Sequence, residues 1–172
     1  VRFLPEEVDS TVQGTFIPFL FSPYLGIGNH RLTFDKSGNL WIGKTHIKWA
    51  GDEGLKKITW NKKKPLLATG VSLPKDGFKI TFNSPLKEAP KLKLSRHTYH
   101  YHEAYGSPKV DLKNVDPTNS QLSSDGKTLT ITLSEITARR LYTIELKGTT
   151  DIQGLPLMGN ILRYNVVKTR PK

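Results

Sequence analysis

The sequence lacks cysteine altogether and lacks any apolar run approaching the ~18 residues that a membrane-spanning helix needs. Without cysteine there can be no disulfide, thiol nucleophile, thiolate zinc site or Cys-x-x-Cys-His haem attachment. The first ten residues, VRFLPEEVDS, contain no methionine and do not have the charged-then-apolar layout of a signal peptide. We therefore expect no membrane span, and we expect the chain to begin inside a longer protein.

Familiar catalytic motifs are also missing. There is no Gly-x-Ser-x-Gly elbow, no glycine-rich phosphate loop followed by a lysine, and no His-Glu-x-x-His pair. The sequence Gly26-Ile27-Gly28 lacks the rest of a dinucleotide fingerprint. Motifs therefore predict no reaction and no catalytic residue.

Acidic residues are few compared with basic ones, since 26 Lys and Arg face 15 Asp and Glu for a net charge of +11. The basic residues are spread along the whole chain, and the tight cluster Lys62, Lys63 and Lys64 directly precedes Pro65, where a linker is expected. Lysines on the solvent faces of strands also prevent edge-to-edge pairing. We interpret the charge as solvated strand faces rather than a phosphate-binding surface, and expect no nucleic-acid partner.

What the chain does contain is strict alternation of apolar and polar residues, clearest between 124 and 157. Two segments there each have one apolar and one polar face, the pattern of half-buried strands. Their apolar positions are Leu129, Ile131, Leu133, Tyr142, Ile144 and Leu146. Such strands cover a core on one side and meet water on the other. This alternation predicts an all-β protein.

Further segments at 78–82, 92–94, 95–105, 110–115 and 161–167 bring the number of strands after Pro65 to about seven, as a β-sandwich requires. The stretch 65–74 marks the boundary, so a sandwich domain is predicted over 66–172. Tyr142, six residues after Ile136, stands where a tyrosine corner would lie, with its hydroxyl bonded to the backbone upstream. The alternative is a plain core tyrosine.

The first 65 residues predict a separate sheet of four short strands, at 15–20, 30–34, 39–43 and 55–60, with a turn at 35–38 between the middle two. Four antiparallel strands in about 45 residues is the repeat of a propeller blade. A single blade is marginal in water. We therefore expect Trp41, Trp49 and Trp60 to anchor a contact with the following domain or a second chain.

The stretch 95–105, SRHTYHYHEAY, has the highest density of side chains that could ligate a metal or take part in catalysis. On a regular strand His100 and His102 share a face and could ligate a metal, with Glu103 or His97 as a third ligand. His97 would then lie on the opposite face, and no second cluster completes a tetrahedral set. A packed aromatic strand with partly exposed histidines is the preferred interpretation, so no metal is expected.

The segment ending in Asp151, Gly154, Pro156 and Leu157 resembles the last strands of bacterial immunoglobulin-like domains. Four longer segments are similar, in order and spacing, to the end of secreted glucose/sorbosone dehydrogenase-like proteins. They are RFLPEEVDSTVQGTFIPFLF, NHRLTFDKSGNLWIG, DGFKITFNSPL and YHYHEAYGSPKVD. The resemblance implies an immunoglobulin-like β-sandwich preceded by a four-stranded blade-like sheet, and a periplasmic or secreted location. It also implies pyrroloquinoline quinone (PQQ) in the parent protein, bound on blades that this sequence does not contain, so no cofactor is expected in this chain.

Two functions are consistent with these patterns. The first is a non-catalytic accessory module that packs on the remaining propeller blades and spaces or orients partner domains. The second is an independent carbohydrate-binding module that uses exposed aromatics, with Tyr99, Tyr101 and Tyr105 as stacking platforms. Sandwich domains serve both purposes, so the fold does not decide between them.

Overall fold

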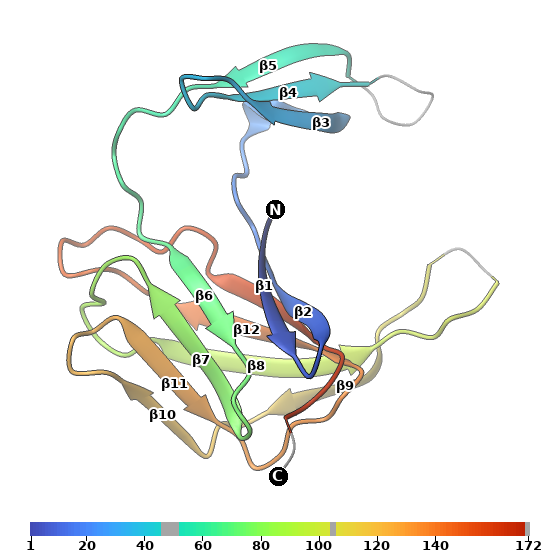
Figure 1. Ribbon diagram of the computed structural model, residues 1–172, viewed down its shortest axis with the longest axis vertical. Coiled ribbons are helices and arrows are strands. Elements are labelled where there is room, and N and C mark those ends of the chain that lie inside the picture. The colour runs from blue at the N-terminus through green and yellow to red at the C-terminus, as the bar shows by residue number, and fades with distance from the viewer. Residues whose placement is uncertain (46–51, 104–105, 171–172) are drawn as a thin grey trace. The chain divides into compact units, whose positions relative to one another are not determined.

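The computed structural model describes residues 1–45, 52–103 and 106–170 (Figure 1). Within these ranges the chain forms three antiparallel sheets and one short 3-10 turn, with no α-helix. No helix in this part of the chain is long and apolar enough to cross a membrane. Contacts divide the chain into two compact units, which we call the sandwich unit (1–19 with 65–172) and the inserted unit (20–64). The predicted all-β class is confirmed.

The sandwich unit contains two sheets. The six-stranded sheet has the order β1 (Arg2–Val8), β2 (Thr11–Ile17), β13 (Ile161–Val166), β12 (Arg140–Lys147), β8 (Lys91–Thr98), β9 (Val110–Val115). The four-stranded sheet has the order β10 (Asn119–Leu122), β11 (Thr128–Thr132), β7 (Gly77–Phe82), β6 (Ala68–Ser72).

The apolar faces of these two sheets share one core, so the unit is a β-sandwich. The ring of Phe78 on β7 lies 5.3 Å from that of Tyr142 and 5.4 Å from that of Tyr164, between ring centroids, across the two layers. The predicted inward positions on β11 and β12 are buried, whereas Thr130 between them is exposed. Period-two alternation therefore assigned the faces of these strands correctly.

Asp151 organises the turn that closes the sandwich after β12. Its carboxylate is buried and accepts the backbone N–H groups of Gln153 (2.9 Å) and Leu155 (2.8 Å). Gly154 has φ +82°, a left-handed conformation that glycine adopts without steric cost. A bridge between Thr150 and Pro156 then directs Leu157 into the core.

The first two strands belong to the sandwich and not to a separate N-terminal domain. Figure 1 shows β1 and β2 alongside the end of the chain, and β2 pairs with β13 through Phe16 and Arg163. Gln13, Thr15 and Ile17 are buried by this pairing. The division predicted from the sequence, 1–65 and 66–172, therefore needs correction. The boundary near Pro65 agrees, but 20–64 is an insertion between β2 and β6.

The inserted unit consists of the 3-10 turn η1 (Pro23–Leu25) and a sheet of three strands, in the order β3 (Asn29–Phe34), β4 (Leu40–Lys44), β5 (Gly54–Ile58). The remaining strand of the four predicted, at 15–20, overlaps β2 and is part of the sandwich. The four-stranded blade predicted from the sequence is therefore not what this unit shows.

The hairpin between β3 and β4 is the one that the sequence predicted. The Asp35 carboxylate accepts the backbone N–H groups of Ser37 and Asn39, both at 2.9 Å, and the indole N–H of Trp41 at 2.9 Å. Gly38 at φ +78° completes the turn. The indole N–H of Trp41 is therefore hydrogen-bonded within the inserted unit, and the Lys57 ammonium lies 5.1 Å from the ring centroid of Trp41.

Candidate functional site

The histidines of the 95–105 stretch are not brought together. Strand β8 ends at Thr98, so His100 and His102 lie in the following loop, where both are exposed, as is Glu103. The expectation that they share a strand face is wrong, because the regular strand stops before them. No group of three or more His, Asp or Glu side chains suited to a metal occurs among residues 1–45, 52–103 and 106–170.

His97 is the buried histidine of this stretch, at 2% exposure on β8. Its Nε2 lies 3.1 Å from the Tyr99 hydroxyl, and the two rings meet edge to face at 5.1 Å. Burial lowers the pKa of His97, and the positive charges of Lys109 and Arg163 lower it further. His97 is therefore a neutral packing residue at neutral pH.

The three tyrosines proposed as stacking platforms have different positions. Tyr99 is half exposed and Tyr101 is fully exposed, while Tyr105 lies outside the described residues. The base of their loop is held by the Ser107 hydroxyl, which accepts the His100 backbone N–H at 3.0 Å. Two aromatic rings are therefore available to a ligand from solvent.

A polar cluster that sequence reasoning missed joins the two ends of the chain. Glu6 on β1 accepts hydrogen bonds from the Tyr164 hydroxyl and from the Leu73 backbone N–H (2.7 Å). Its other oxygen accepts from the Arg170 guanidinium at 2.8 Å. We call Glu6, Gln13, Tyr164 and Arg170 the terminal clamp.

Gln13 extends this clamp from β2. Its Nε2 donates to the Tyr164 hydroxyl at 3.0 Å, and its carbonyl oxygen accepts the backbone N–H groups of Val167 and Lys168, both at 2.9 Å. Burial raises the pKa of Tyr164, and the Glu6 carboxylate raises it further, so the phenol stays protonated and donates. The sequence carried only one signal of this role, a polar Gln13 in an otherwise strand-like segment.

A second polar cluster joins side chains of β8, β9 and β12, which are neighbours in the six-stranded sheet in the order β12-β8-β9. The Asp111 carboxylate accepts from the Arg140 Nε at 3.0 Å and lies 3.5 Å from Arg96 and 3.4 Å from Lys113. The bond from Arg140, more than the nearby charges, lowers the pKa of Asp111. The Asp111 carboxylate contacts cations from β8, β9 and β12, so the cluster is a structural link between three strands.

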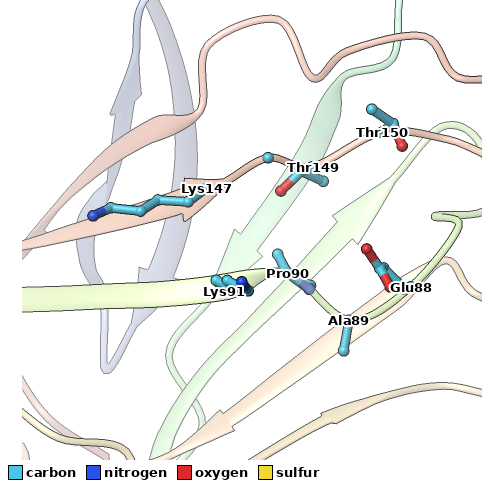
Figure 2. A pocket seen from close by; sticks show the side chains of 8 residues that line it. Glu88, Ala89, Pro90, Lys91, Lys147, Thr149 and Thr150 are labelled. Carbon is cyan, nitrogen blue, oxygen red and sulfur yellow. The ribbon is translucent and has the colours of Figure 1, made fainter.

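A shallow depression of about 350 Å³ lies between the start of β8 and the end of β12 (Figure 2). It is lined by Glu88, Ala89, Pro90, Lys91, Lys147, Gly148, Thr149 and Thr150. The Thr149 hydroxyl donates to the Leu146 carbonyl oxygen at 3.2 Å. Glu88, Lys91, Lys147 and Thr150 also line the depression with polar groups.

The inserted unit exposes many large apolar side chains for its size. Eight are more than two-fifths exposed: Leu20, Phe21, Tyr24, Ile27, Leu32, Phe34, Leu55 and Trp60. The Trp60 indole donates to the Lys63 carbonyl oxygen at 2.9 Å, and Trp49 lies outside the described residues. The predicted contact of these tryptophans with the sandwich or a second chain stays a prediction.

Comparison with known proteins adds one finding. No protein-family model matches the sequence, and no curated protein matches it. Among solved structures, the crystal structure of the S-layer protein rSbsC is similar to 63% of this chain, at 22% sequence identity and a TM-score of 0.44. The match spans 14% of the length of that S-layer chain.

Proposed function

We propose that this chain is a non-catalytic structural module that holds other parts of a larger secreted or periplasmic protein at a fixed spacing. The observation that carries this proposal is the terminal clamp. It ties residues just inside both ends of the chain to one sandwich, so that segments attached at either end would be held and not tethered loosely. A second support is the core, in which Phe78, Tyr142 and Tyr164 fill the space between the sheets.

The proposal includes a finer assignment for each unit. The sandwich is immunoglobulin-like, supported by the Tyr142 hydroxyl, which accepts the Thr137 backbone N–H at 3.0 Å as in a tyrosine corner. The inserted unit is a partial propeller blade, supported by its hairpin and by the sequence resemblance to dehydrogenase-like proteins. In that case the parent protein supplies further blades, and any quinone would bind there.

The clamp can be tested with spin labels, because the native chain has no cysteine to interfere. A variant with two cysteines, replacing Val1 and the exposed Thr169, would carry nitroxides near the two ends, and pulsed electron resonance would measure the distances between them. We expect one narrow distribution that broadens in the Glu6→Gln background. A broad distance distribution in the labelled chain that retains Glu6 would overturn the fixed-spacing role.

The non-catalytic part of the proposal needs its own test. The chain should neither bind PQQ saturably nor reduce an artificial electron acceptor in the presence of PQQ, Ca²⁺ and glucose, because a quinone cleft needs several blades around one axis. Saturable quinone binding would contradict the proposal.

Carbohydrate binding is the second candidate, favoured by the exposure of Tyr99 and Tyr101 on the β8–β9 loop. Aromatic rings presented on a pinned loop can stack on sugar rings. A glycan array probed with the chain and with Tyr101→Ala would separate the candidates. Binding that disappears in Tyr101→Ala would favour this second function.

A further inference from the structure

The edge strand β3 presents an unusually bare surface. Within the described part of the chain it pairs only with β4, so half of its backbone hydrogen-bonding groups face away from the sheet. All six residues of β3 are exposed, including Leu32 (63%) and Phe34 (68%). An exposed apolar edge of this kind is a template for pairing with another strand.

Other edges in the described sheets carry more protection than β3, whose single charged residue is Arg31. Strand β1 contains Pro5, β5 carries Lys56 and Lys57, and β10 is only four residues long. Strands β6 and β9 each have a register shift that leaves regular pairs only at 70–72 and 113–115. The only irregularity of β3 lies at its start, before Arg31, and the run from Arg31 to Phe34 is regular. Strand β3 is therefore the edge best suited to accept a partner.

The register of the sheet defines what a fourth strand would meet. One face carries Leu32 and Phe34, in line with the buried Ile42 and Leu40 of the next strand. The opposite face carries Arg31 and Thr33. Alternate residues of a strand added beside β3 would lie on the two faces. Those on the first face would be apolar, next to Leu32 and Phe34, and one of those on the second face would lie opposite Arg31.

Charge decides which partner fits. The inserted unit, residues 20–64, contains nine Lys and Arg against three Asp and Glu, a net charge of +6. A second copy would bring the same positive charge to the interface and would be repelled. Acidic residues opposite Arg31 are attracted, and acidic flanks complement the unit as a whole.

We propose that β3 accepts a strand from an acidic partner protein or domain, in which apolar residues alternate with Asp or Glu, as the fourth strand of the inserted sheet. Backbone hydrogen bonds would supply the affinity of this strand addition, and the alternation would supply the specificity. The inference deepens the proposed function, because it names the chemistry of the part that the module would hold.

The test uses the full chain and two fluorescent seven-residue peptides, one alternating valine with glutamate and the other valine with lysine. Fluorescence anisotropy should show the glutamate peptide binding about threefold more tightly or better. Hydrogen exchange should show new protection over 31–34. Arg31→Glu should weaken the preference for the glutamate peptide, because an acidic residue opposite position 31 then meets a like charge. Lys79→Glu makes the same charge change on β7, which is paired on both sides, and should leave the preference unchanged.

Equal affinity for the two peptides, absence of saturable binding, or protection confined to other strands would overturn the proposal. A concentration-dependent dimer with β3 protected would also overturn it, since a second copy would then be the occupant. Circular dichroism checks that Arg31→Glu folds, and Arg31→Ala, which should weaken the preference less than Arg31→Glu does, serves as the second variant. The spin-label test concerns the sandwich unit alone, so failure of one proposal is distinguishable from failure of the other.

Discussion

The Tyr164 hydroxyl donates a hydrogen bond to the Glu6 carboxylate, joining β13 to β1 across 158 positions of sequence. The Glu6 carboxylate also accepts hydrogen bonds from the Leu73 backbone N–H and from the guanidinium of Arg170 in the C-terminal segment. Its carboxylate is therefore the acceptor on which three separate segments depend.

We expect Glu6→Gln to lower the free energy of unfolding by about 1 to 3 kcal/mol, because hydrogen bonds to a charged acceptor are lost or weakened in a partly buried site. The neighbouring Glu7 is exposed on the opposite side of β1. Glu7→Gln should therefore change stability by less than about 0.5 kcal/mol. Urea unfolding of the two variants measures the difference, and equal effects would mean that the clamp contributes nothing.

Tyr142→Phe should cost about 1 to 3 kcal/mol, since the Thr137 backbone N–H loses its acceptor at a part-buried position. The matched control is Tyr101→Phe, where the removed hydroxyl is fully exposed. Thermal unfolding followed by circular dichroism compares the two. Indistinguishable melting temperatures would argue against a stabilising tyrosine corner.

Leu146→Ala should destabilise the sandwich by about 2 to 5 kcal/mol, because the side chain is completely buried and its removal leaves a cavity. Thr130 is exposed on the solvent face of β11, so Thr130→Ala should cost well under about 1 kcal/mol. Denaturant titration distinguishes these values. A comparable loss in both variants would contradict the assignment of inner and outer faces.

The β3–β4 hairpin should weaken in acid. Hydrogen bonds from the Asn39 and Trp41 side chains lower the pKa of Asp35, so the folded hairpin favours the ionised carboxylate. That contribution is present above the ordinary carboxyl pKa of about 4 and is lost as the pH falls below it toward the lowered folded value. Nuclear magnetic resonance of the Trp41 indole N–H during acid titration follows the loss. In Asp35→Asn the resonance should show no such transition, and an identical transition there would assign it to another group.

We expect no structural metal in this chain, because His100 and His102 are separated from His97 by the end of β8. Extended treatment with a chelator should leave the melting temperature unchanged. A fall of several degrees that added zinc reverses would instead support a histidine site.

Local patterns in the sequence determined the all-β class, the faces of β11 and β12, the Asp35 hairpin and the turn at Asp151. These features depend on neighbours within a few residues, where side-chain alternation and turn chemistry act directly. The tyrosine corner is similar, since Tyr142 bonds to a backbone group only five residues away.

Only the tertiary structure decided where β1 and β2 belong, what Glu6 and Gln13 contact, and where β8 ends. The first strands read equally well as part of a small N-terminal sheet, because a strand pattern specifies a buried face but not the strand that pairs with it. The pairing of Phe16 with Arg163 joins opposite ends of the chain. It is selected by burial of Thr15 and Ile17 in a shared core, which no local pattern encodes.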